Sequence, residues 1–247
     1  MTKVSKNVGK ANKPKVRLYG IAICSYLFNK LFDPDESFSK LQTDVKGQVD
    51  LNQKEHRTEL LDWLNNWGCR QFKRSDHEDA SAEICAWYKQ HGPSLPGGDV
   101  DLWLANDAQL EAAANAYGAL SKRRACKRGN SDVTIGPTGA AKILFAIRPR
   151  LLLPWDELIR QCFGHDGFHA SYLAFLKNTR TEIIDLASEC KQYGFSLSEL
   201  PDRVRGPKDT VPQLVDNFYW ITCQTFEPTP DRVRQWFEWS QPAVPPC

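Results

Sequence analysis

Apolar side chains recur every three or four residues through most of this sequence, the spacing that places them on one face of an α-helix. In one segment Leu60, Leu61 and Leu64 share such a face, and Gly68 follows as a helix stop. We find no convincing run of alternating apolar and polar residues, the pattern typical of a half-buried strand. The sequence therefore predicts an all-α fold.

The pattern predicts helices at 16–32, 55–67, 79–90, 107–120, 137–147, 156–163, 171–193, 211–226 and 231–239. The glycine- and proline-rich segment 91–99 is expected to be a loop. It is also a possible boundary between two lobes of a helical bundle, with a cleft between them. Residues 1–14 form a basic tail that we expect to be disordered. Residues 15–247 then form a single domain.

The chain of 247 residues can bury a sizeable core without disulfides or a metal. Its eight cysteines are scattered and form no C-x-x-C pair, which suits a reducing compartment. No signal peptide or membrane-length apolar run is seen. Cys162, His165 and His169 have metal-like spacing but lack a second ligand pair, and we expect His165 and His169 to line a loop. We expect a monomeric, cytoplasmic protein with no metal, no cofactor and no membrane association.

The formal net charge is only +2, but the basic residues are unevenly distributed. Residues 1–17 contain six basic side chains and no acid, and residues 121–150 contain eight against the single acid Asp132. A basic region on an otherwise acidic body favours a polyanionic partner. The alternative is a basic loop that is merely solvated.

The segment 132–160 combines a binding element with a reactive group. Gly136-Pro-Thr-Gly139 precedes an apolar helix, whose free N–H groups can bind a phosphate. The alternative is an ordinary helix N-terminus. Asp156 then opens the next helix, where it can act as a helix cap or as a catalytic carboxylate.

These residues resemble the helix-hairpin-helix DNA glycosylase superfamily, in which a glycine-containing hairpin grips the DNA backbone and a catalytic Asp begins a following helix. The resemblance places Gly136 to Gly139 at the hairpin and Asp156 at the catalytic position. The superfamily's hairpins usually read Gly-x-Gly, whereas this one reads Gly-Pro-Thr-Gly. The nucleophilic lysine of bifunctional members lies nearer the hairpin than Lys142, and their four-Cys iron–sulfur loop is absent. The resemblance therefore implies a monofunctional enzyme without an iron–sulfur cluster.

We accordingly expect Asp156 to be catalytic. The expected DNA contacts are Gly136, Thr138, Gly139, Lys142, Arg148, Arg150, Arg123 and Arg124. Lys142 has the alternative of simply facing solvent. Trp155, Trp67 and Tyr26 are candidates for an aromatic base pocket, although most tryptophans in such a chain belong to the core.

The function that follows is excision of a damaged or modified base from double-stranded DNA. The target base leaves the helix, and hydrolysis of its N-glycosidic bond leaves an abasic site. Repair is the expected role, and defence against modified foreign DNA is a variant of it. The alternatives are a non-catalytic helix-hairpin-helix DNA-binding module and a helical scaffold whose basic surface is only solvated.

Overall fold

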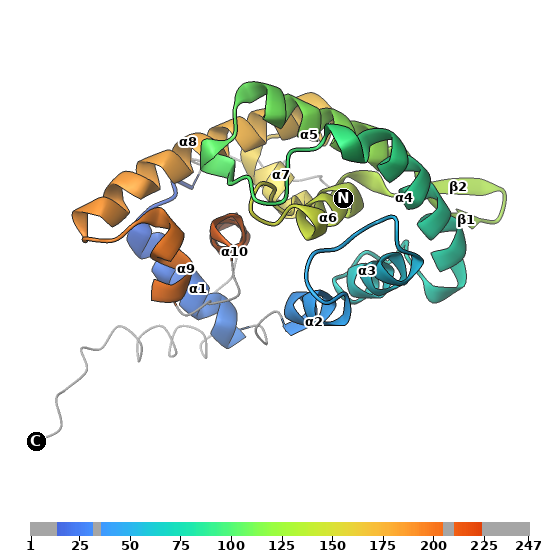
Figure 1. Ribbon diagram of the computed structural model, residues 1–247, viewed down its shortest axis with the longest axis horizontal. Coiled ribbons are helices and arrows are strands. Elements are labelled where there is room, and N and C mark those ends of the chain that lie inside the picture. The colour runs from blue at the N-terminus through green and yellow to red at the C-terminus, as the bar shows by residue number, and fades with distance from the viewer. Residues whose placement is uncertain (1–13, 32–35, 205–209, 224–247) are drawn as a thin grey trace, which may run out of the picture.

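The computed structural model describes residues 14–31, 36–204 and 210–223, which are mostly helical (Figure 1). The helices are α1 (Leu18–Leu31), α2 (Glu36–Asp44), α3 (Lys54–Asn66), α4 (His77–His91), α5 (Asp107–Ser121), α6 (Gly136–Ile147), α7 (Glu157–Phe163), α8 (His169–Gln192), α9 (Leu200–Arg203) and α10 (Val211–Cys223). Short 3-10 turns occur at η1 (Arg74–Asp76), η2 (Gly92–Ser94), η3 (Leu102–Leu104) and η4 (Leu197–Glu199). The all-α prediction is confirmed in this coarse sense. The predicted helix at 231–239 and tail residues 1–13 lie outside the described ranges.

Helix α6 lies near the centre of the molecule, below α5 and α8 in Figure 1. Its residues from Gly139 to Ile147 are buried except for Lys142. A helix that is apolar all round needs neighbours on every side. Helices α3 and α5 pack directly against α6, and α5 also packs along α8. Since the proposed phosphate-binding turn begins α6, it is anchored to the most enclosed helix of the fold.

Helix α10 is buried along its length from Val211 to Tyr219. It packs against α1 and α7, so that the helix beginning after Asp156 contacts the C-terminal part of the described chain. Helices α1, α9 and α10 gather at the left of Figure 1, whereas α2 and α3 lie at the lower right.

The segment 91–99 is mostly loop, as predicted, with the turn η2 at its start. It is tied to the end of α6, because Arg148 Nε donates a hydrogen bond to the Pro96 carbonyl at 2.5 Å. The backbone of Leu102 also donates to the Arg150 carbonyl at 3.0 Å. The division into two lobes at this loop stays a prediction.

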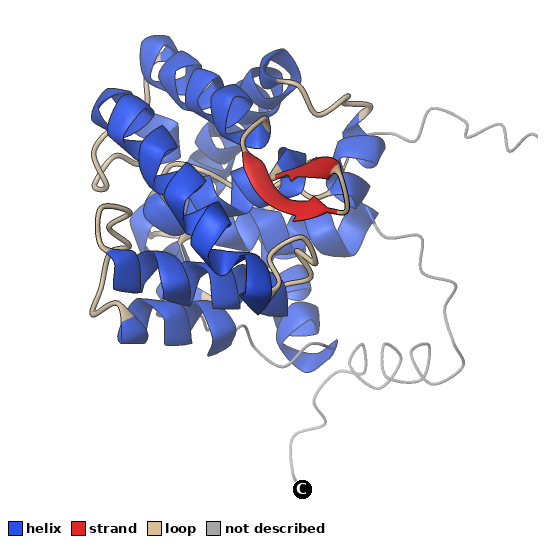
Figure 2. Cartoon of the chain, turned by 90° about the vertical axis from the view of Figure 1, so that its right-hand side faces the viewer, coloured by secondary structure: helices blue, strands red, loops and turns tan. Residues whose placement is uncertain are grey.

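Two strands that the sequence did not predict form an antiparallel hairpin, β1 (Arg124–Arg128) and β2 (Ser131–Thr134), shown in red in Figure 2. The expectation of no strands was wrong here for a physical reason. The register shifts between Arg124 and Cys126, and this irregularity leaves Ala125 and Cys126 buried in succession. Such a shift removes the alternation by which a strand is recognised.

Candidate functional site

The turn Gly136–Gly139 is the first turn of α6, and the element before it is the β-hairpin. Gly136 has φ +71, a left-handed conformation that glycine adopts without strain, and Pro137 follows in the first turn of the helix. The Gln71 side chain donates to the carbonyl of Ile135 at 2.9 Å and fixes the approach to the helix. Helices α5 and α6 are thus joined by β-strands, where the resemblance implied a turn between two helices.

A surface groove of about 450 Å³ lies in front of this turn. It is lined by Gly68, Cys69, Arg70, Gln71, Arg128, Val133, Thr134, Ile135, Gly136, Pro137 and Thr138. Arg70 and Arg128 are exposed, and an Arg128 nitrogen donates to the Arg70 carbonyl at 3.4 Å. Two arginines therefore line a groove at the start of α6, where the helix dipole favours an anion.

Arg160 connects this turn to the helix that follows Asp156. Its Nη1 donates to Thr138 Oγ1 at 3.1 Å and to the Trp155 carbonyl at 2.7 Å. Burial lowers the pKa of Arg160, and the charges of Tyr117, Asp156 and Glu157 oppose this effect. One half-buried guanidinium thus holds the N-terminus of α6 beside the residue that precedes Asp156.

Asp156 caps α7: its Oδ1 accepts a hydrogen bond from the Ile159 backbone at 2.9 Å. The cap interpretation is therefore confirmed. The carboxylate is half-buried, and its Oδ2 makes no hydrogen bond within the described part of the chain. The pKa of Cys223 on α10 is raised by burial, by the neighbouring Cys162 thiol and by the charge of Asp156. Helix α7 packs against α10, and one Asp156 oxygen is left for another role.

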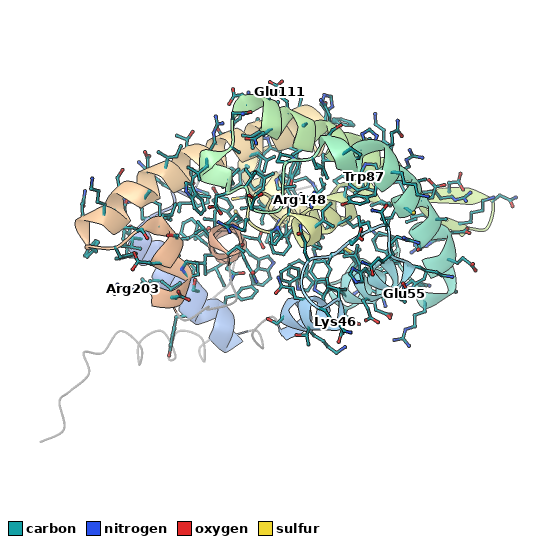
Figure 3. The ribbon with its side chains drawn as sticks, in the orientation of Figure 1. Lys46, Glu55, Trp87, Glu111, Arg148 and Arg203 are labelled. Carbon is teal, nitrogen blue, oxygen red and sulfur yellow. The ribbon has the colours of Figure 1, made fainter. Side chains whose placement is uncertain are left out.

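Two of the predicted DNA contacts have partners within the protein. Arg148 is buried near the centre of the molecule (Figure 3), with hydrogen bonds to the carbonyls of Pro96 and Ile147. Arg150 forms a two-pronged ion pair with Asp101, both N···O distances being 2.7 Å. Because each guanidinium is committed within the protein, neither is positioned at the groove.

The other predicted cations also have internal partners. Arg123 pairs with Glu83 at 3.6 Å, and Arg124 lies 3.8 Å from Asp79 and 3.9 Å from Asp132. These are partly exposed, loosely spaced pairs, which contribute little to the stability of the fold.

Lys142 is held by Trp67. Its Nζ donates to the Trp67 carbonyl at 2.6 Å and lies 4.3 Å from the centre of the Trp67 ring. This lysine thus satisfies a carbonyl at the end of α3 and does not simply face solvent.

The three candidate pocket aromatics lie in different surroundings. Trp155 is completely buried and packs against the rings of Tyr172 and Phe175 at 5.2 and 5.4 Å. Trp67 is partly exposed and packs against Trp63 at the end of α3. Tyr26 lies on α1, which contacts α8 and α10.

Gly139 serves packing. A Cβ at this position would lie 3.0 Å from Gln71 Nε2, 3.1 Å from Ile135 Cγ2 and 3.2 Å from Phe72 Cε2. A Cβ at Gly136 would meet no atom within 4 Å. Gly136 is therefore the glycine whose backbone faces the groove.

Within the described ranges, no group of three or more His, Cys, Asp or Glu side chains has the arrangement of a metal site. His165 lies in the loop after α7, as expected, and meets the Trp155 ring edge to face with 5.5 Å between ring centres. His169 is exposed and begins α8, so the expectation that it lines a loop was wrong.

Sequence reasoning did not assign Arg70, Arg128 or Arg160 to the site. Arg128 lies in the basic stretch 121–150, so the clustering of charge was a signal for it. Arg160 lies three residues after Glu157, so helix spacing was a signal for its place on α7. Arg70 follows α3 and reaches the groove only through tertiary packing.

Comparison with protein-family models, curated proteins and solved structures finds no match. None of the helices in the described ranges is both long and apolar enough to span a membrane.

Proposed function

We propose that this protein is a monofunctional DNA N-glycosylase that acts as a monomer on double-stranded DNA. The observation that carries the proposal is the pair of hydrogen bonds from Arg160 to Thr138 and to the Trp155 carbonyl. These bonds hold the N-terminus of α6, where a phosphate can bind, beside the start of α7, which carries the Asp156 carboxylate. This arrangement is what the superfamily resemblance requires of residues 132–160.

In this proposal the first turn of α6 binds a DNA phosphate through its free N–H groups. Arg70 and Arg128, which both line the groove, bind the same or a neighbouring phosphate. They take the place of Arg148 and Arg150, whose side chains have internal partners. The turn thus acts as the DNA-gripping hairpin of the superfamily, although a β-hairpin precedes it.

Asp156 supplies the chemistry. Cleavage of the N-glycosidic bond transfers the bonding electrons to the departing base and leaves positive charge on the sugar. A carboxylate close to the sugar stabilises this charge and orients the water that attacks the anomeric carbon. The water oxygen stays on the sugar and its proton neutralises the base, which leaves an abasic site. The cap uses Oδ1, so Oδ2 is the oxygen we assign to this role.

The flipped base has to be received beside Asp156. We place this pocket at the solvent-facing side of the half-buried Asp156 carboxylate.

The test is incubation of the full chain with duplexes that each carry one modified base, followed by alkali, which breaks DNA at abasic sites. We expect strand breaks with the wild type and none with Asp156→Asn. Glu157→Gln is the matched control, because Glu157 is the neighbouring, exposed carboxylate and pairs with Gln161. Equal cleavage by wild type and Asp156→Asn would remove Asp156 from the catalytic role.

The second candidate is a DNA-binding module without catalysis. The groove, with Arg70 and Arg128 at the α6 N-terminus, favours it independently of Asp156. No cleavage of any duplex, combined with binding that weakens steeply as salt rises, would select this alternative.

A further inference from the structure

An exposed aromatic side chain, Phe168, lies next to the proposed site. Phe168 is 65% exposed and forms the N-cap of α8. The preceding Gly167 lies against the start of α6 and against Arg160: a Cβ there would be 3.2 Å from Pro137 Cγ and 3.6 Å from Arg160 Cδ. Phe168 is therefore one residue from direct contact with both elements of the proposed site.

The loop that carries Phe168 is held firmly. Asp166 Oδ1 accepts hydrogen bonds from the Phe168 backbone at 2.9 Å and from Ser171 Oγ at 2.6 Å. The buried Tyr117 hydroxyl donates to the Gly167 carbonyl at 2.8 Å. Gly167 itself has φ +90, which favours glycine. The fold thus fixes the position from which this phenyl ring projects.

The residue after Phe168 connects this loop to the C-terminal part of α5. The next residue, His169, packs against Gly118 of α5, where a Cβ would lie 2.8 Å from His169 Cβ. Lys122 follows one helical turn after Gly118 and is exposed. A single exposed apolar residue is ordinary on a protein surface. Its fixed position beside the start of α6 and Arg160 is the basis of our inference.

We infer that Phe168 is the side chain that inserts into the DNA base stack and fills the space vacated by the flipped nucleotide. The inference rests on the proposed function, because it assumes duplex DNA bound at α6. Proteins that unstack DNA commonly insert an apolar wedge such as Phe. An aromatic ring stacks on bases of any sequence, so Phe168 promotes flipping without selecting the base.

The test uses the full chain and a duplex with 2-aminopurine, a fluorescent base whose emission rises when it unstacks, next to a modified base. We expect Phe168→Ala to reduce the unstacked population roughly 10-fold, in line with the loss of one stacking contact. Phe168→Leu should retain part of the signal, because it keeps an apolar wedge. Overall binding, measured by fluorescence anisotropy, should change less, since phosphate contacts dominate it.

Tyr193→Ala is the matched control. Tyr193 is 74% exposed and lies at the other end of α8, roughly 37 Å away for a straight helix. If Phe168→Ala gives the same fluorescence as the wild type, the inference is overturned. If the wild type still releases the base, the proposed function is kept. Wild type that binds the duplex without unstacking it also overturns the inference. Wild type that neither binds DNA nor releases a base overturns both.

Discussion

Arg160 Nη1 donates a hydrogen bond to Thr138 Oγ1 at 3.1 Å across 22 residues of sequence. The bond joins the first turn of α6 to the helix that Asp156 begins. The same nitrogen donates to the Trp155 carbonyl at 2.7 Å, so the two helix starts share one donor. A shift at either helix start would therefore be transmitted to the other.

This connection predicts energetic coupling between the two side chains. In a double-mutant cycle with Thr138→Val and Arg160→Met, we expect a coupling free energy of about 1 kcal/mol, typical of a hydrogen bond to a charged donor on a partly buried surface. Urea unfolding of the wild type, both single variants and the double variant measures it. Purely additive effects would mean that the bond contributes nothing to the arrangement.

Substitutions of Asp156 should separate capping from catalysis. Asn caps helices as well as Asp does, so Asp156→Asn should unfold at nearly the wild-type urea concentration. Asp156→Ala loses the bond to the Ile159 N–H and should be less stable by about 1 kcal/mol. Both variants should lack activity. If Asp156→Asn kept its activity and Asp156→Ala lost it, activity would follow stability. Asp156 would then have a capping role alone.

The two glycines of the turn should respond differently to the same substitution. Asn tolerates the left-handed conformation at Gly136, so Gly136→Asn should cost less than about 1 kcal/mol. Gly139→Asn would force a side chain against Gln71, Ile135 and Phe72 and should cost at least about 2 kcal/mol. The free energy of unfolding in urea gives the order, and the reverse order would contradict the assigned roles.

The salt dependence of DNA binding should identify the phosphate contacts. Arg70→Ala and Arg128→Ala should each reduce the slope of log K against log salt by about 1, because each removes one phosphate contact. Arg150→Ala serves as the control, since Arg150 is paired with Asp101, and its slope should equal that of the wild type. If the slope fell in Arg150→Ala and stayed unchanged in Arg70→Ala and Arg128→Ala, Arg150 would be the DNA contact, as the sequence predicted.

Helix positions were predictable from the sequence because their signals are local. The α5 start has a capping box between Asn106 and Gln109, and α8 is followed by Gly194 with φ +79, close to the predicted limits. The β-hairpin was not predictable by alternation, because the register shift places the buried residues Ala125 and Cys126 side by side.

The roles of the basic residues depended on distant partners. Arg148 binds the carbonyl of Pro96, 52 residues away, and Arg150 binds Asp101, 49 residues away. Charge clustering in the sequence could not distinguish these structural cations from Arg70 and Arg128 at the groove. Trp155 was likewise assigned by its proximity to Asp156 in sequence, whereas its ring points into the aromatic core.

The most direct measurement of the central claim is release of the free base from a modified duplex, detected by mass spectrometry without alkali. The account predicts that wild type and Glu157→Gln release base and form abasic sites in equal amounts. Asp156→Asn, folded to the same extent, should be slower by at least about 100-fold, the lower range for loss of a catalytic carboxylate. Base release by Asp156→Asn at the wild-type rate would contradict the account.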